Sequence, residues 1–109
     1  MDISIQNDLN AIVHKINLLL PDAKVYLFGS YATGRQKADS DIDLCVIAPK
    51  YKERRMQVLY SIRVAIRGTT RLPVDILAFT DDEFERKSKL KPTIQYTIAN
   101  EGVLLNAQY

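Results

Sequence analysis

LFGSYATGRQKADSDIDLCVIA, residues 27–48, contains a Gly-Ser pair after one apolar run and an Asp-x-Asp pattern entering the next. The runs AKVYLF (23–28) and DIDLCVIA (41–48) are rich in β-branched and aromatic residues, and each stops at a glycine or a proline. Both are therefore predicted strands. The segment between them, 29–40, is short for a parallel crossover, which usually contains a full helix. We therefore expect an antiparallel or mixed pairing of these strands.

The residues before and after this stretch predict helices. Apolar residues recur at spacings of three and four from Ile5 to Leu20, which predicts an amphipathic helix that ends before Pro21. A second helix is predicted over about 51–67. Its apolar face is marked by four residues at helical spacing: Met56, Leu59, Ile62 and Ile66.

The C-terminal third of the sequence predicts one more strand and short elements. PVDILAF (73–79) is a third strand, and TDDE (80–83) has the form of a capping box that begins a short helix. A further short helix is predicted over 93–100, and VLLN (103–106) is a candidate edge strand. The order indicates one α/β (α+β) domain over 1–109, with a small mixed sheet flanked by helices.

Composition narrows the class of protein. The 109 residues are 47% hydrophobic and 26% charged, as in globular domains, and the net charge of +2 is too small for a protein that coats nucleic acid. The one cysteine, Cys45, allows no intrachain disulfide and fits a reducing compartment. No apolar stretch approaches the roughly 20 residues that cross a bilayer, and the first residues do not resemble a signal peptide. We expect a cytoplasmic protein.

Three aspartates in predicted strands indicate a metal site. Asp41 and Asp43 share one face of their strand, about 6.6 Å apart, where each raises the other's pKa unless a cation intervenes. Asp75 interrupts PVDILAF at a position where an apolar residue is expected. If the third strand lies beside the second, three carboxylates converge, and these can hold two metals about 3.5–4 Å apart for phosphoryl transfer.

The Gly-Ser pair supplies groups that suit a phosphate. Gly29 allows a sharp turn and a close approach because it has no Cβ. Ser30 begins a predicted short helical turn, whose free N–H groups attract anions, and its hydroxyl adds a donor.

The segment GSYATGRQKADSDIDL (29–44) resembles the signature of the DNA polymerase β-like nucleotidyltransferase superfamily, Gly-Ser followed after ten residues by Asp-x-Asp. In size the chain resembles the minimal nucleotidyltransferases, including the antitoxins of HEPN/MNT toxin–antitoxin modules. The resemblance extends from VYLFGS to ANEGVLLN, nearly the whole chain. It implies a mixed sheet flanked by helices, ATP as substrate and two Mg²⁺ ions.

The resemblance also implies a role for each motif residue. Gly29 and Ser30 would hold the triphosphate. Asp41 and Asp43 would coordinate both Mg²⁺ ions, and Asp75 would complete one metal site and help to activate the attacking hydroxyl. That hydroxyl would attack the α-phosphorus, and pyrophosphate would leave.

One position departs from the pattern of the minimal members. Thr33 stands where an arginine is frequent, which removes a phosphate contact. Arg35 or Lys37 could replace that contact, or each could be a solvated loop charge. We include Arg35 and Ser40 among the predicted nucleotide-binding residues.

The resemblance implies a function in a toxin–antitoxin pair. We expect an adenylyltransferase (AMPylation) that transfers AMP from ATP to a tyrosine of a helical HEPN ribonuclease toxin, because the chain shows no second domain to bury a small acceptor. Two alternatives stay open: an antitoxin that neutralises by binding alone, and nucleotidyl transfer to a small molecule or an RNA end. The intact Gly-Ser pair and three aspartates argue against a vestigial site. Membrane binding and direct nucleic-acid binding are not expected.

Other residues allow more than one interpretation. The segment 50–71 contains seven basic residues and one acid, with Arg63 and Arg67 one helical turn apart. It is either a solvated helix face, a docking face for an acidic partner or an RNA-facing patch, and the lack of interleaved aromatics favours a protein over RNA. Tyr31 either stacks on a base or is a surface or packing side chain. Tyr109 is expected to fray.

Overall fold

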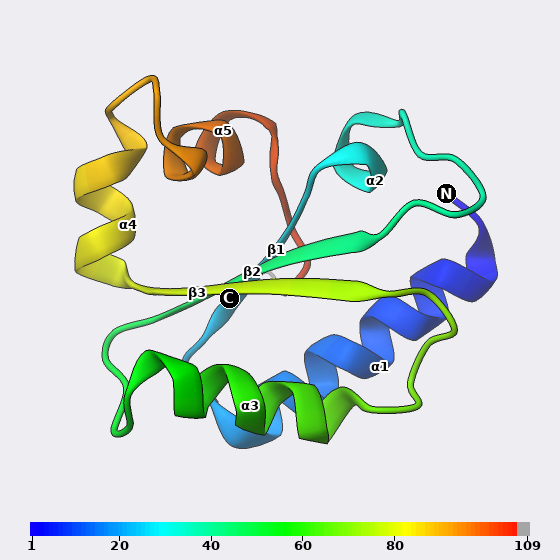
Figure 1. Ribbon diagram of the computed structural model, residues 1–109, viewed down its shortest axis with the longest axis horizontal. Coiled ribbons are helices and arrows are strands. Elements are labelled where there is room, and N and C mark those ends of the chain that lie inside the picture. The colour runs from blue at the N-terminus through cyan, green and yellow to red at the C-terminus, as the bar shows by residue number, and fades with distance from the viewer. Residues whose placement is uncertain (107–109) are drawn as a thin grey trace.

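The computed structural model describes residues 1–106, so the expectation for Tyr109 lies outside the described residues. Helices and strands alternate along most of the chain, as Figure 1 shows, and two helices follow one another near its end. In chain order the elements are α1 (Ile3–Leu19), β1 (Lys24–Phe28), α2 (Ser30–Thr33), β2 (Ile42–Ala48), α3 (Arg55–Ile66), β3 (Val74–Thr80), α4 (Asp81–Ser88), α5 (Ile94–Glu101) and β4 (Val103–Leu104).

Four strands form one mixed sheet in the order β3-β2-β1-β4. β1 pairs antiparallel with β2 on one side and with β4 on the other, whereas β2 and β3 are parallel and joined through α3. The predicted mixed sheet, the antiparallel pairing of the first two strands and the edge position of VLLN are confirmed. A crossover helix was needed only between β2 and β3, where the chain is long enough to hold one.

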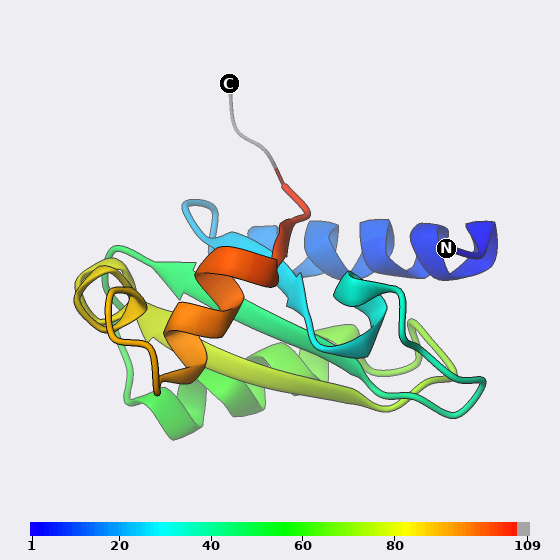
Figure 2. The ribbon, with the colours of Figure 1, turned by 90° about the horizontal axis from the view of Figure 1, so that it is seen from above.

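The sheet lies between helices on its two faces (Figures 1 and 2), and it separates two apolar cores. Alternation along β2 sends Ile42, Leu44 and Val46 to the face covered by α1 and α3, where the larger core lies. Cys45 and Ile47 point to the opposite face, where they pack with Phe79 and with Ile98 of α5 in the smaller core. The face of Asp43 is thus the α4/α5 face, because residues two apart on a strand share a face.

Helix α3 differs from its prediction in two respects. It begins at Arg55 rather than near Tyr51. The Tyr51 hydroxyl lies within hydrogen-bond distance of the carbonyl oxygens of Val46 (3.1 Å) and Phe79 (2.9 Å), so Tyr51 links the C-terminal parts of β2 and β3. The predicted inclusion of Met56 in its buried face is wrong. The fully packed positions of α3 are Val58, Ile62 and Ile66, and Met56 is 77% exposed.

Local capping explains where the short helices begin. Thr80 and Glu83 form the predicted capping box: the Thr80 hydroxyl accepts from the Glu83 N–H, and the Glu83 carboxylate accepts from the Thr80 N–H. The Thr93 hydroxyl oxygen accepts from the Tyr96 N–H and caps α5.

Among the described residues, no helix combines the length and the apolar character needed to span a bilayer.

Candidate functional site

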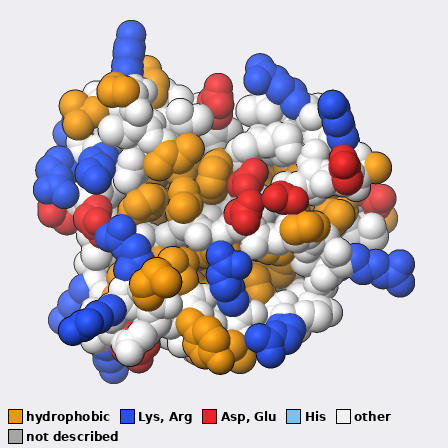
Figure 3. Space-filling model, in the orientation of Figure 1, with side chains coloured by type: hydrophobic (Ala, Val, Ile, Leu, Met, Phe, Trp, Pro, Cys, Tyr) orange, Lys and Arg blue, Asp and Glu red, His pale blue; other side chains and the backbone are white. Residues whose placement is uncertain are grey.

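The beginnings of β2 and β3 bring the three aspartates to one end of the sheet. Asp43 and Asp75 are register partners on these parallel strands, and adjacent strands lie about 4.8 Å apart. Asp41 precedes β2 by one residue, and the Ile42 N–H donates to the Pro73 carbonyl oxygen at 2.9 Å, which ties the two strand entrances together. Figure 3 shows acidic side chains gathered over this part of the sheet. The expected position of the third strand beside the second, on which this convergence depends, is confirmed.

The aspartates influence one another's protonation. Partial desolvation, followed by the charges of Asp75 and Asp41, raises the pKa of Asp43. Desolvation, together with the charge and a hydrogen-bonding contact of Asp75, raises the pKa of Asp41. Three like charges on neighbouring strand positions destabilise the ionised state unless a cation offsets them. The site therefore favours a positively charged ligand.

Gly29 lies directly against the carboxylate of Asp43. Phe28 and Asp43 are register partners, so the turn after β1 passes over the Asp43 side chain. Gly29 has a φ of 75° and a ψ of −151°, and a Cβ at this position would lie closer than 3.0 Å to Oδ2 of Asp43. Only glycine adopts such a backbone without strain. The antiparallel pairing of β1 and β2 thus places the Gly-Ser turn next to the aspartates.

The residues after Gly29 form the predicted helical turn, α2. The Thr33 N–H and Thr33 hydroxyl both donate to the Gly29 carbonyl oxygen, at 3.2 and 3.3 Å, so Thr33 holds the turn closed. The first N–H groups of a helix, here those of Ser30 and Tyr31, have no intrahelical acceptor. Thr33 thus has a structural partner at the position where related sequences often have arginine.

The return segment from α2 to β2 contains the remaining predicted nucleotide-binding residues. Arg35 is exposed, and its N–H donates to the Ser30 carbonyl oxygen at 2.9 Å. The Ser40 hydroxyl oxygen accepts from the N–H of Lys37 at 2.8 Å and so shapes the loop. Tyr31 is buried in the larger core, which confirms the packing alternative over base stacking.

Carboxylate oxygens are the ligands that Mg²⁺ prefers, so the chemistry of this donor set fits the expected metal. As the side chains lie, no three His, Cys, Asp or Glu residues within 1–106 form a ready-made metal cluster. The side chains of Asp41 and Asp75 lie in hydrogen-bonding contact, and Asp43 is the register partner of Asp75. Rotation of these side chains at fixed backbone positions can bring all three carboxylates toward one cation, whose charge would offset their repulsion.

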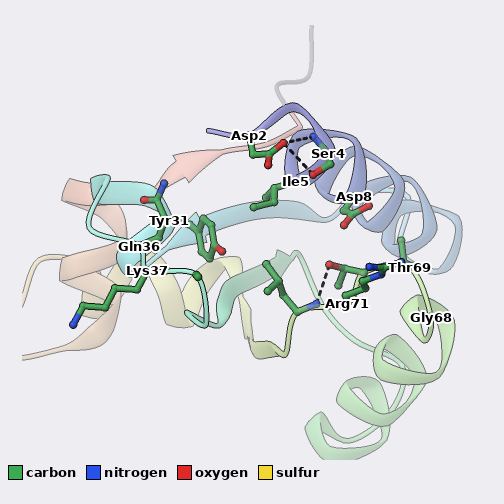
Figure 4. Close-up of a pocket in the computed structure, with 13 residues that line it drawn as sticks. Asp2, Ser4, Ile5, Asp8, Tyr31, Gln36, Lys37, Gly68, Thr69 and Arg71 are labelled. Carbon is green, nitrogen blue, oxygen red and sulfur yellow. Dashed lines mark hydrogen bonds between the residues drawn. The ribbon is translucent and has the colours of Figure 1, made fainter.

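A cavity of about 810 Å³ lies behind the return segment and is a separate feature that sequence reasoning missed. Figure 4 shows it between the start of α1, with Asp2 and Asp8, and the α3–β3 connection, with Arg71. Gln36 contributes a buried Oε1 without a hydrogen-bond partner among the described residues. Neither the Gly-Ser pair nor the three aspartates at the strand entrances line this cavity, so a molecule inside it would touch the return segment but not the carboxylates of the candidate metal site.

Solved structures share this fold. A chain from the crystal structure of a toxin–antitoxin with AMP-PNP is 24% identical, with a TM-score of 0.60 over 94% of this chain and 74% of that one. A candidate nucleotidyltransferase from Sulfolobus solfataricus is 22% identical, with a TM-score of 0.55 and 95% and 86% covered. A chain from the complex of tri-AMPylated Shewanella oneidensis HEPN toxin with MNT antitoxin is 20% identical, with a TM-score of 0.53 and 96% and 73% covered.

Sequence comparison identifies the family. No curated protein is similar enough to count as a relative. The sequence profile of the nucleotidyltransferase domain matches residues 9–105, which include both strand entrances and the turn between β1 and α2. The match covers nearly the whole chain and agrees with the mixed sheet and its acidic end. The chain therefore belongs to the nucleotidyltransferase domain family.

Proposed function

We propose that this protein transfers AMP from ATP to a tyrosine hydroxyl of a HEPN ribonuclease toxin, and that it thereby acts as an antitoxin. The observation that carries the proposal is the contact of Gly29 with Asp43, beside the register pair of Asp43 and Asp75. This places a turn suited to phosphate against carboxylates suited to Mg²⁺.

Each motif residue has a defined task in this reaction. Gly29 and the first N–H groups of α2 bind the triphosphate, and Asp41, Asp43 and Asp75 hold two Mg²⁺ ions. When bound, the ions neutralise the charge that develops on the phosphates. Asp75 orients the acceptor hydroxyl and takes its proton. The hydroxyl oxygen bonds to the α-phosphorus, the bond between this phosphorus and the bridging oxygen breaks, and pyrophosphate leaves.

Arg35 and Ser40 supply further contacts to the nucleotide. Arg35 is exposed on the return segment and can turn toward the triphosphate, and Lys37 is its alternative. Ser40 directly precedes Asp41, so its hydroxyl lies at the end of the loop that meets the acidic residues. Both residues tune binding of the nucleotide rather than the transfer itself.

The exposure of the site supports a large acceptor. Asp41 and Asp75 are exposed at the open end of the sheet, so a tyrosine on the surface of another protein can approach them. The similar chains in toxin–antitoxin structures, one with AMP-PNP and one with an AMPylated HEPN toxin, support ATP and a toxin as the two substrates.

The test is labelling of a candidate HEPN toxin, which is to be sought first among the proteins that neighbouring genes encode. Purified protein is incubated with the toxin, Mg²⁺ and ATP labelled at either the α- or the γ-phosphate. We expect the toxin to retain the α-label and not the γ-label, and Asp41→Asn with Asp43→Asn to abolish labelling. A toxin Tyr→Phe variant at the modified position should also stay unlabelled.

Matched controls separate this proposal from the alternatives. Asp22→Asn with Asp82→Asn changes two exposed aspartates outside the acidic strand entrances and should leave labelling intact. If the Asp41/Asp43 variant still neutralises the toxin fully at matched expression, neutralisation is by binding and the proposed mechanism is refuted. If label appears only on added RNA or on a small hydroxyl compound, the toxin is not the acceptor.

A further inference from the structure

Helix α3 carries an exposed apolar stripe. Met56, Tyr60 and Val64 are 77%, 67% and 43% exposed, and they follow one another at spacings of four residues. Such residues line one face of a helix, here along about 12 Å. Isolated exposed apolar residues are ordinary, but a contiguous row marks an interaction surface. The buried residues Val58 and Ile62 point toward the core, so the stripe is additional to the face that packs.

Basic side chains flank the stripe. Arg63 lies seven residues after Met56 and therefore on the same face, and Arg67 follows at the end of the helix. Both are exposed. Among residues 1–106 the one ion pair joins Arg55 to Glu83, so Arg63 and Arg67 have no carboxylate partner within this part of the chain. Figure 3 shows Lys and Arg side chains next to apolar ones over α3.

We propose that this stripe, Met56–Tyr60–Val64 with Arg63 and Arg67, docks the toxin through an acidic surface that has an apolar centre. The identity of the partner rests on the proposed function above. Charge complementarity favours this partner. The two arginines, which have no carboxylate partner within residues 1–106, would pair with Asp and Glu side chains on the toxin, and the apolar residues of the stripe would pack against an apolar strip between those acids.

Other occupants fit less well. A second copy packed face to face would add two more arginines and no carboxylate of the stripe to the same interface, so the two charged surfaces would not be complementary. An RNA strand would find one stacking side chain, Tyr60, where nucleic-acid platforms present several.

The stripe is separate from the candidate catalytic site. α3 covers the sheet face of Ile42 and Leu44, whereas Asp43 points to the opposite face with Cys45. A partner seated on α3 therefore does not cover the acidic end of the sheet. The stripe fixes the toxin to the enzyme, and the acceptor tyrosine comes from a segment or a further toxin subunit that reaches the other face.

The test measures binding and transfer separately. Binding of the candidate HEPN toxin is titrated by calorimetry against three variants: Met56→Ser with Tyr60→Ser, Arg63→Glu with Arg67→Glu, and Asp41→Asn with Asp43→Asn. We expect the first two to weaken binding roughly tenfold or more, because both remove central contacts of an interface. The third should bind like the unchanged protein but transfer no label. In the transfer assay, the stripe variants should show a raised KM for the toxin and an unchanged kcat.

The controls change matched residues elsewhere. Ile3→Ser with Leu18→Ser replaces two side chains that are 73% and 70% exposed on α1, and Lys89→Glu with Lys91→Glu reverses two exposed charges outside α3. Both should bind the toxin within about twofold of the unchanged protein. Raising the salt concentration should weaken binding of the unchanged protein more than that of the Arg63/Arg67 variant.

Several outcomes overturn the docking proposal. If the stripe variants bind and transfer normally, the stripe is not the toxin surface, and the proposed function stands. If they lose self-association in sedimentation, or RNA binding in a gel shift, while toxin binding is unchanged, the occupant is a second copy or RNA. If the unchanged protein binds the toxin through the stripe but never transfers AMP, the docking surface stands and the proposed function fails.

Discussion

The contact between Gly29 and Asp43 predicts a specific response to Gly29→Ala. Two effects oppose this substitution. Alanine is strained at the φ of 75° and ψ of −151° that Gly29 adopts, and its methyl group would lie less than 3.0 Å from the Asp43 carboxylate. A non-glycine residue in such a conformation costs about 1–3 kcal/mol. Displacing the packed carboxylate adds about another 1–3 kcal/mol. Together these lower the free energy of unfolding by about 2–6 kcal/mol.

Gly34 provides the matched control. It also has a positive φ, 76° with a ψ of 16°, but nothing lies within 4 Å of the position of its Cβ. Gly34→Ala should therefore cost only the backbone strain, about 1–2 kcal/mol. Transfer activity should fall by orders of magnitude in the Gly29 variant, because Asp43 must move, and should change little in the Gly34 variant.

Urea denaturation and a double-mutant cycle measure the carboxylate contact. Asp43→Ala removes the carboxylate, so Gly29→Ala made in that background should lose only the backbone contribution. The expected coupling between the two positions is about 1–3 kcal/mol, and each kcal/mol shifts the melting temperature by about 4–8 °C in a domain of this size. A Gly29 variant no less stable than the Gly34 variant, or a coupling near zero, would refute the argument.

Three further outcomes are expected. In the absence of Mg²⁺, Asp43→Asn should stabilise the protein by about 0.2–1 kcal/mol, because it removes repulsion from Asp75. Mg²⁺ should raise the melting temperature of the unchanged protein but not of this variant. An effect of Mg²⁺ that survives the substitution contradicts the metal assignment. The hydrogen bond from the Thr80 N–H lowers the pKa of Glu83 from its ordinary value of 4.5. The ionised carboxylate therefore stabilises the folded protein above this ordinary value, and that contribution is lost as the pH falls through the lowered pKa. Glu83→Gln should therefore cost about 0.5–1 kcal/mol at pH 7 and less near pH 3 in urea titrations, and an equal cost at both pH values argues against the capping box. Burial raises the pKa of the Cys45 thiol to about 12, so iodoacetamide should label it only after unfolding, and rapid labelling of the native protein contradicts its buried position.

Local patterns in the sequence predict most of the elements and the residues of the candidate site. Alternating apolar residues and the flanking glycine and proline identify β1 and β2, and the Thr80 to Glu83 pattern identifies the start of α4, because these signals act within a few residues. The aspartates are recognisable because carboxylates are costly in strands that enter a core.

The predicted apolar face of α3 was wrong at Met56, because local sequence signals do not show which neighbours a helix packs against. Periodicity identifies apolar positions but not which of them find a neighbour, and only packing against α1 and the sheet selects Val58, Ile62 and Ile66. The exposed row that remains became visible only in three dimensions.

The sequence by itself determined the strand residues, the Gly-Ser turn and three aspartates of unusual placement, because each depends on neighbours in the chain. Tertiary structure decided three contacts. Gly29 lies against the Asp43 carboxylate, Asp43 is the register partner of Asp75, and the Ile42 N–H donates to the Pro73 carbonyl oxygen. These contacts join residues up to 32 positions apart through strand register. Register is a property of the assembled sheet, because it requires both strands and the buried faces that align them.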